Sequence, residues 1–253
     1  MVKYTPAEMM VCAAAREIAD GEVVFVGMRL PMLAFYVAKH THAPNAWGLF
    51  ENGVLRDRPA EAPVITMGDT PNQARAIKLT SLAEVMSWMS RGRVGLGFIG
   101  GAQVDEFGNV NTHWVDTPGR RIRLPGSGGG ADIACLAGRL LIIMNHERRR
   151  LVPRVDFITS PGWGPDPEWR ARQGLPRGGP LALITSMGVF RFPEGRAVLY
   201  SIHPGVSLEE VRANTGWELR VHPELSTTPE PTDEELAIIR RYDPKGFWTG
   251  WGR

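Results

Sequence analysis

Cysteine is scarce in this sequence, since Cys12 and Cys135 are the only two among its 253 residues. Each lies among small apolar residues, a setting typical of buried and unreactive thiols. Two such cysteines exclude a disulfide scaffold and fit a reducing compartment, so we expect a cytoplasmic protein. The paired Cys and His spacings of a zinc site are also missing, and we expect no bound metal.

Long apolar runs and an excess of one charge are missing as well. The N-terminus, MVKYTPAEMM, lacks the apolar stretch of a signal peptide, and no run approaches the roughly 18 residues that span a bilayer. The 29 basic and 27 acidic residues nearly cancel. The basic run 146–150 (HERRR) can bind phosphate, although such runs more often form a solvated face or an interface edge. We therefore expect neither a membrane nor a nucleic acid as partner.

What the sequence does contain is an alternation of helix and strand patterns. Residues 5–8 (TPAE) supply an N-cap, a proline at the first helical position and the glutamate of a capping box. Residues 22–26 (EVVFV) indicate a short buried strand that ends at Gly27, and Pro31 then begins a second helix.

The same order recurs along the chain. Further strands are predicted at 47–50, 94–99, 139–144, 155–159, 180–185 and 197–202, and further helices at 80–89, 133–137, 207–214 and 232–242. Residues 162–179, rich in Gly, Pro and Arg, are predicted to form a long surface loop. The alternation predicts an α/β fold, with an open and mostly parallel sheet covered by helices on both faces. We expect a single domain over residues 1–253.

A carboxylate stands at the end of one predicted strand, in residues 49–53 (LFENG). Ligands of such sheets bind at the carboxyl ends of the strands, where Gly27, Glu51, Gly100 and Gly101 are all expected. Glu51 is therefore a candidate nucleophile, which must be ionised although desolvation would raise its pKa. The alternative is an exposed glutamate that merely precedes an Asn-Gly turn. Arg29, Arg56 and Arg58 lie near the same predicted edge.

Two further segments offer groups that bind anions. In residues 100–111 (GGAQVDEFGNVN), a tight turn at 105–109 separates Gln103 from Asn111. Their side-chain amides can stabilise an oxyanion, or can simply tie the turn together. In residues 126–132 (GSGGGAD), four glycines precede a predicted helix, which favours either an anion-binding loop or a flexible turn. This loop is not a P-loop, because no Gly-Lys-Ser/Thr follows.

Taken in order, these segments resemble the family I CoA-transferases, and specifically the B chain of glutaconate CoA-transferase. The similarity extends from the N-terminal helix to about Gly246. The stretches that carry it are GEVVFVGMRLPMLAFYVAK (21–39), HAPN (42–45), FENG (50–53), GGAQVDEFGNVN (100–111), GSGGGADIA (126–134), HERRRLVPRVDFITSPGW (146–163) and MGVF (187–190).

The resemblance implies a CoA-transferase fold, also called NagB/RpiA-like, and a reaction. Glu51 matches the family's nucleophilic glutamate, although Phe50 stands where many relatives have serine. This carboxylate would take CoA from an acyl-CoA, such as glutaconyl-CoA or a related dicarboxylyl-CoA, as a glutamyl-CoA thioester and pass it to a second carboxylic acid. The resemblance assigns oxyanion or substrate binding to Asn111, Gly188, Gln103 and Gly101. It assigns the CoA or acyl pocket to Gly128, Gly129, Gly130, Asn52 and Gly53.

The resemblance also implies that this chain is the β subunit of a larger enzyme. A homologous α subunit would complete a heterotetramer or larger assembly, with coenzyme A as substrate and no permanently bound cofactor. Trp47, Phe50 and Trp114 are candidates for the surface that this partner covers, or for core packing. Three other functions stay open: an acyl-CoA hydrolase, including the ring-opening type, a decarboxylase on the same scaffold, and a non-catalytic regulator that binds CoA or a sugar phosphate.

Overall fold

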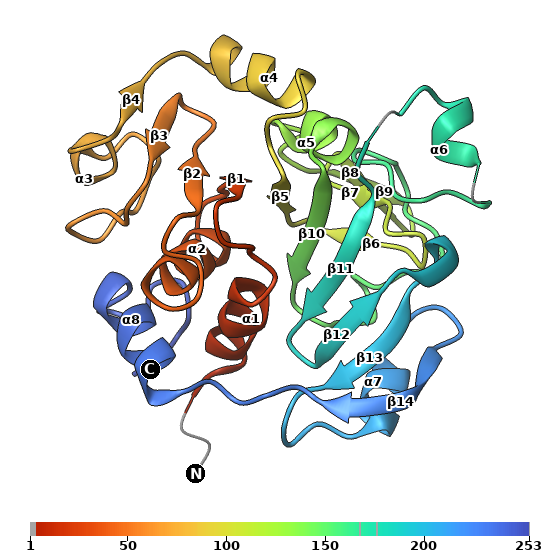
Figure 1. Cartoon of the computed structure of the whole chain (residues 1–253). Helices are drawn as coiled ribbons and strands as arrows, with labels where there is room; N and C mark the ends of the chain where they lie inside the picture. Colours follow the sequence, from red (N-terminus) through yellow and green to blue (C-terminus); the bar gives the residue numbers. More distant parts are fainter. Residues whose placement is uncertain (1–3, 167, 176, 253) are drawn as a thin grey trace. The chain divides into compact units, whose positions relative to one another are not determined.

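The computed structural model describes residues 4–166, 168–175 and 177–252. It contains two compact units (Figure 1). Unit 1 is formed by Met1–Phe98 together with Pro229–Arg253, and unit 2 by Ile99–Thr228. The single domain expected over residues 1–253 stays a prediction. Within the described ranges, no helix combines the length and the apolar character needed to cross a membrane.

The strands of unit 1 follow the order β5-β1-β2-β3-β4. The central strand, β1, pairs in parallel with both β2 and β5, whereas β3 and β4 add antiparallel pairs at the edge. The parallel pairs place the carboxyl ends of β1, β2 and β5 at one edge of this sheet. The strand bounds are β1 (Val23–Phe25), β2 (Trp47–Leu49), β3 (Val54–Arg56), β4 (Lys78–Leu79) and β5 (Leu96–Ile99).

The helices of unit 1 begin where the sequence places caps. Thr5 and Glu8 form the predicted capping box of α1, and Ser81 caps α4 by accepting from the Glu84 N–H. Helix α2 packs against α1 and α8, and Arg240 binds the fully buried carboxylate of Glu8 at 2.9 Å. The bounds are α1 (Pro6–Ala15), α2 (Leu30–His40), α3 (Thr70–Gln73), α4 (Leu82–Ser90) and α8 (Asp233–Tyr242).

The strands of unit 2 follow the order β14-β13-β12-β11-β10, with two separate hairpins, β6-β7 and β8-β9. Strands β10 and β11 pair in parallel, while β12 is antiparallel to both of its neighbours. The strand bounds are β6 (Gln103–Val104), β7 (Val110–Asn111), β8 (Trp114–Thr117), β9 (Arg120–Arg123), β10 (Arg139–Met144), β11 (Pro180–Thr185), β12 (Gly188–Arg191), β13 (Val198–Ile202) and β14 (Arg220–Thr227). The helices are α5 (Gly130–Leu136), α6 (Trp169–Arg172), η1 (Pro193–Gly195) and α7 (Leu208–Asn214).

The predicted α/β class is confirmed, but two local predictions are wrong. Residues 155–159 form bends rather than a strand, because the Asp156 N–H binds the Gln103 side chain instead of a neighbouring strand. Residues 162–179 are more than a surface loop, because Arg170 of α6 is buried. Its guanidinium donates to the carbonyl oxygens of Gly162 and Ala134 at 2.8 and 3.0 Å, which anchors the segment to the rest of unit 2.

Candidate functional site

Glu51 lies at the tip of the turn that joins β2 to β3. The Phe50 N–H donates to Val54 O at 2.8 Å and the Gly53 N–H donates to Phe50 O at 3.0 Å, which closes a three-residue loop. Such loops need a left-handed residue at their last position, and Gly53 has φ +98°. The sequence therefore places Glu51 at a fixed point just beyond the carboxyl end of β2.

The turn is also held from outside. A Cβ on Gly53 would lie 2.0 Å from Thr80 O, so only glycine fits against this neighbour. The Thr80 N–H donates to Gly53 O at 2.9 Å, and Asn52 donates from Nδ2 to Met67 O at 2.7 Å. Asn52 and Gly53, expected to line the substrate pocket, thus hold the turn in place, and their contact with substrate stays a prediction.

The Glu51 side chain is half-exposed. Among the described residues, none donates a hydrogen bond to its carboxylate or forms an ion pair with it. Phe50, directly before it, is fully buried, so its ring contributes nothing to the exposed surface around Glu51. A carboxylate on a rigid turn with unshared lone pairs is able to attack an electrophile without first breaking an internal bond.

The loop that follows β1 lies at the same edge of unit 1, because β1 and β2 are parallel. Its last residue, Arg29, has φ +69°, which is an unusual and strained backbone for a residue with a side chain. The guanidinium lies 5.3 Å from the Trp248 ring centroid. This strained position is the N-cap of α2 and directly precedes the helix.

The other two arginines near this edge have structural roles or exposed positions. Arg56 is fully buried, and its guanidinium donates to five backbone carbonyls, those of Arg58, Pro59, Pro71, Asn72 and Ala74. Arg58 is exposed and pairs with Asp57 at 2.9 Å. Arg56 therefore stabilises the 57–74 loop, since each of its three guanidinium nitrogens donates to a backbone carbonyl there.

In unit 2 the predicted oxyanion amides are buried and bound to each other. Asn111 donates from Nδ2 to Gln103 Oε1 at 2.7 Å and to Trp114 O at 2.6 Å. Gln103 in turn donates to Asp156 Oδ2 at 2.9 Å. These hydrogen bonds are the ones expected if the two amides only tie the turn together, which is the alternative to an oxyanion role. An oxyanion role for either amide stays a prediction, and for Asn111 it requires one of its two bonds to be exchanged.

The two predicted backbone contributors are similarly enclosed. The Gly188 N–H donates to Thr185 Oγ1 at 3.1 Å in the buried start of β12. A Cβ on Gly101 would lie 2.3 Å from a Val110 methyl, so this glycine permits close packing on β7. Substrate binding by Gly101 and Gly188 stays a prediction.

The glycine loop opens α5, as expected. Gly129 is the N-cap and is buried, and Gly130 is the first helical residue. Gly128 has φ +47° and is exposed, with no atom within 4 Å of the place a Cβ would take. The backbone conformation, and not crowding by neighbouring atoms, therefore explains why residue 128 is a glycine. Among the described residues, no group of three or more His, Cys, Asp or Glu side chains is placed to hold a metal ion.

Burial sets the ionisation of two groups in unit 2. His146, part of the basic run, is only 3% exposed and lies between the hydroxyls of Thr185 and Thr215, at 3.0 and 3.1 Å. Burial lowers the pKa of His146 to about 4, so its ring is neutral at pH 7. Burial also raises the pKa of Asp105, against the hydrogen bonds from Asn109 that lower it.

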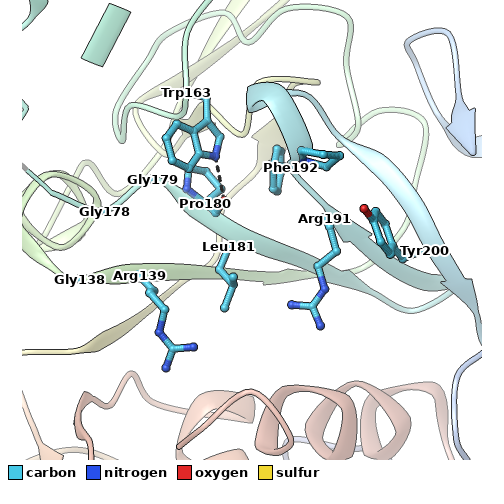
Figure 2. Close-up of a pocket in the computed structure, with 11 residues that line it drawn as sticks. Gly138, Arg139, Trp163, Gly178, Gly179, Pro180, Leu181, Arg191, Phe192 and Tyr200 are labelled. Atoms are coloured by element: carbon cyan, nitrogen blue, oxygen red, sulfur yellow. Dashed lines mark hydrogen bonds between the residues drawn. The ribbon is translucent and has the colours of Figure 1, made fainter. Parts of the chain in front are cut away.

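Unit 2 also has a cavity of about 560 Å³ at the amino ends of β10 and β11 (Figure 2). Arg139 and Arg191 extend to the same side of the sheet, on either side of Leu181, with Tyr200 beyond Arg191. Both arginines also take part in other interactions within the chain. This cavity lies at the opposite end of the strands from the edge where ligands of parallel sheets bind.

The aromatic residues expected at a partner surface differ in exposure. Trp47 is 37% exposed, whereas Phe50 is fully buried. Trp114 is half-buried and packs on Phe157, with 4.3 Å between ring centroids. Phe50 is thus a core residue, and only Trp47 of the three presents a large exposed area.

Comparisons with known proteins indicate one family. A family model described as Coenzyme A transferase matches residues 7–214. The B chain of the 3-oxoadipate CoA-transferase of Pseudomonas knackmussii is 37% identical over 250 residues, which cover 97% of this chain and 95% of that protein. The B chain of the glutaconate CoA-transferase of Acidaminococcus fermentans is 35% identical over 252 residues, which cover 95% and 93%. The crystal structure of glutaconate coenzyme A-transferase from Acidaminococcus fermentans has a TM-score of 0.89, with 31% identity and 98% of each chain covered.

Proposed function

Because this chain belongs to the coenzyme A transferase family, we propose that it is the β subunit of an enzyme that moves CoA from an acyl-CoA to a free carboxylate through Glu51. The family predicted from the collinear motifs is confirmed by these matches. The observation that carries the proposal is the position of Glu51, half-exposed and unpaired among the described residues, on a turn fixed by Gly53 and Thr80.

The proposed reaction uses only the carboxylate of Glu51 as a covalent group. Its oxygen attacks the thioester carbonyl carbon, the carbon–sulfur bond breaks, and a mixed anhydride and CoA thiolate result. The thiolate then attacks the glutamyl carbonyl, which releases the first carboxylate and leaves CoA on Glu51 as a thioester. A second carboxylate repeats these steps in reverse order, so that the acceptor leaves as its CoA thioester and Glu51 is restored.

The rigid turn supports this chemistry in a specific way. Glu51 acts first as a nucleophile, through its carboxylate oxygen, and is then attacked at its carbonyl carbon. Both atoms must therefore stay in position for two successive partners. The bonds of Gly53 with Phe50 and Thr80 keep the backbone of this turn in one place, which lowers the entropic cost of each step. These are backbone bonds, and no donor among the described residues binds the Glu51 carboxylate and weakens it as a nucleophile.

The relatives suggest the substrate class and the partner. The two named above act on 3-oxoadipate and glutaconate, both of which are dicarboxylic acids, and each is one of the unlike subunits of its enzyme. We therefore propose a dicarboxylic acyl group for this enzyme and a homologous α subunit as its partner. Asn111, Gln103, Gly101 and Gly188 are proposed to shape the substrate site of this complex, with Gly128–130 beside the CoA or acyl group.

The test is to trap the covalent intermediate in the complex with the α subunit. Incubation with an acyl-CoA and no acceptor should attach CoA to this chain, and borohydride or hydroxylamine should then modify the peptide that contains Glu51. Glu61→Ala is the control, since Glu61 is an exposed glutamate of the same unit that pairs with Arg75. Steady release of CoA into water without an adduct would indicate a hydrolase instead, and loss of CO₂ a decarboxylase. Ligand binding without turnover, unchanged in Glu51→Ala, would indicate a regulator.

A further inference from the structure

Arg29 has a backbone conformation that normally belongs to glycine. Three described residues that carry a side chain have positive φ, namely Arg29, Arg75 and Glu194. Glu194, at φ +55° and ψ +23°, lies near the left-handed region that such residues can enter. Arg29 lies far from that region, at φ +69° and ψ −126°, which is the conformation of the first central residue of a type II′ turn. Strain of this kind persists at functional positions, so we expect a role for the Arg29 side chain.

Arg29 and Glu51 follow neighbouring parallel strands of unit 1. The register of β1 and β2 pairs Phe25 with Leu49, and the Val26 N–H continues the pairing by donating to Leu49 O at 2.9 Å. Beyond these pairs the two chains leave the same edge of the sheet, with Glu51 in the turn after β2 and Arg29 in the loop after β1. Neighbouring strands are only about 4.8 Å apart. A short ligand at this edge is therefore able to contact both residues.

Trp248, in the C-terminal segment of unit 1, supports the guanidinium of Arg29. The guanidinium carbon lies 5.3 Å from the centroid of the ring. Trp248 is itself held in place, because its backbone N–H donates to the buried carboxylate of Asp243 at 3.0 Å. The next residue, Thr249, accepts at its carbonyl oxygen from Thr5 Oγ1 at 3.0 Å. An arginine stacked on an aromatic ring keeps its in-plane N–H groups available for a carboxylate.

The charge of Arg29 has no counterpart in the part of the chain that the structure describes. Its side chain is exposed, forms no ion pair with an acidic residue there, and makes no cap bond to α2. The other two arginines near this edge differ, since Arg56 binds backbone carbonyls and Arg58 binds Asp57. Arg29 thus combines an unusual backbone, a fixed aromatic support and an uncompensated charge at the edge that carries Glu51.

We propose that Arg29 binds the second carboxylate of a dicarboxylic acyl group whose other end reacts at Glu51, and so determines the acyl specificity of the enzyme. The inference rests on the proposed function, because it takes Glu51 as the nucleophile and the acyl group as dicarboxylic. A guanidinium binds a carboxylate through two parallel hydrogen bonds, which a methyl group in the same place cannot accept. The phosphates of CoA fit this place less well, because the pantetheine arm separates them from the reacting thioester.

The main experiment compares Arg29→Gly with Arg75→Gly in the complex with the α subunit. The donors are succinyl-CoA, glutaryl-CoA and adipyl-CoA, each matched with the monocarboxylic donor of the same carbon number, namely butyryl-CoA, valeryl-CoA and hexanoyl-CoA. Arg29→Gly should lower the preference for the best dicarboxylic donor over its match, measured as the ratio of kcat/KM values. We expect a loss of roughly ten- to a hundredfold, the usual effect of removing a hydrogen bond to a charged group.

Arg75→Gly is a matched control and should keep the wild-type preference. Arg75 is also an exposed arginine of unit 1 with positive φ, at +55°, but it pairs with Glu61 at 2.7 Å. Glycine relieves the strain at residue 29, so Arg29→Gly should unfold thermally at the wild-type temperature or above. A lower unfolding temperature with an unchanged preference would show that Arg29 only stabilises the fold, and would overturn the proposal.

Direct binding separates this inference from the proposed function. The free acid of the best dicarboxylic donor, titrated calorimetrically into the complex, should lose affinity in Arg29→Gly and keep it in Arg75→Gly. This arm needs no turnover, so it tests Arg29 even if no CoA is trapped on Glu51. Equal losses of kcat/KM for dicarboxylic and monocarboxylic donors would overturn the proposal, because Arg29 would then act on a part that both donors share. A wild-type enzyme that prefers none of the dicarboxylic donors would overturn it as well.

Discussion

Two turns of this protein have similar backbones and opposite environments. The β2-β3 turn of unit 1 carries Glu51, and the β6-β7 turn of unit 2 carries Asp105. Each joins short antiparallel strands and contains a glycine with positive φ, Gly53 at +98° and Gly108 at +74°. Glu51 is half-exposed and unpaired among the described residues, whereas Asp105 is 2% exposed.

The hydrogen bonds explain what each carboxylate is suited to do. Asp105 accepts from the Phe107 and Asn109 N–H groups, both at 3.1 Å, and from the Asn109 side chain at 3.0 Å. A carboxylate with this many donors is a structural group, because its lone pairs are already used. The comparison shows that burial and partners, and not the type of turn, separate a candidate nucleophile from a structural acid.

The largest effect is expected at Glu51. Glu51→Ala should lower kcat for CoA transfer by about a thousandfold or more, since the covalent route is lost. The midpoint of thermal unfolding should stay close to that of the wild type, because the side chain bonds to none of the residues that the structure describes. Rates and unfolding curves of the same preparation provide both measurements. Residual activity above about a tenth of wild type would contradict the nucleophile assignment.

Asp105→Ala should show the reverse pattern. Removing this carboxylate leaves two backbone N–H groups and a side-chain amide buried without an acceptor, which costs about 3 kcal/mol of unfolding free energy. Urea denaturation of the variant and the wild type measures the difference. The folded fraction should retain most of its kcat, and a variant as stable as the wild type would show that the bonds contribute little.

Gly53→Ala should affect both properties, to a smaller extent. The added Cβ meets Thr80 O at 2.0 Å, and the positive φ is unfavourable for alanine. We expect a loss of about 2 kcal/mol in stability and a drop in kcat as the turn shifts. Gly119→Ala is a matched control, since Gly119 has φ +73° but no atom within 4 Å of the place a Cβ would take. Equal effects of the two variants would show that backbone strain alone is responsible and that Thr80 is not.

The smallest effect concerns the pH dependence of a second buried polar group, His146. Its pKa is about 4 in the folded chain and about 6.5 when unfolded. The unfolded state therefore binds more protons between these values, and this group's contribution to stability is complete above pH 6.5 and declines as the pH falls towards 4. From pH 7 to pH 5 the loss should be about 1 to 2 kcal/mol. His146→Gln should remove this part of the slope in denaturation curves, and an unchanged slope would contradict the buried neutral ring.

Local features were predictable because short-range chemistry sets them. The capping box of α1, the cap of α4 and the strand at Arg139–Met144 are found where the sequence predicts them. The turn of Glu51 is likewise encoded within a few residues, since Gly53 supplies the positive φ that closes it. The family was recognisable for a related reason, because a collinear series of such segments is specific where each alone is not.

Partners distant in the sequence were not predictable. Gln103 meets Asp156, 53 residues away in a segment where a strand was expected, and this contact occupies a predicted oxyanion amide. Arg56 was expected near a ligand edge but braces five carbonyls of a neighbouring loop. The β8-β9 hairpin was missed, although Pro118-Gly119 between two short alternating segments is a hairpin signal. Backbone conformation and capping depend on neighbours in the chain, which the sequence displays, whereas burial and the satisfaction of polar groups depend on residues that only folding brings together.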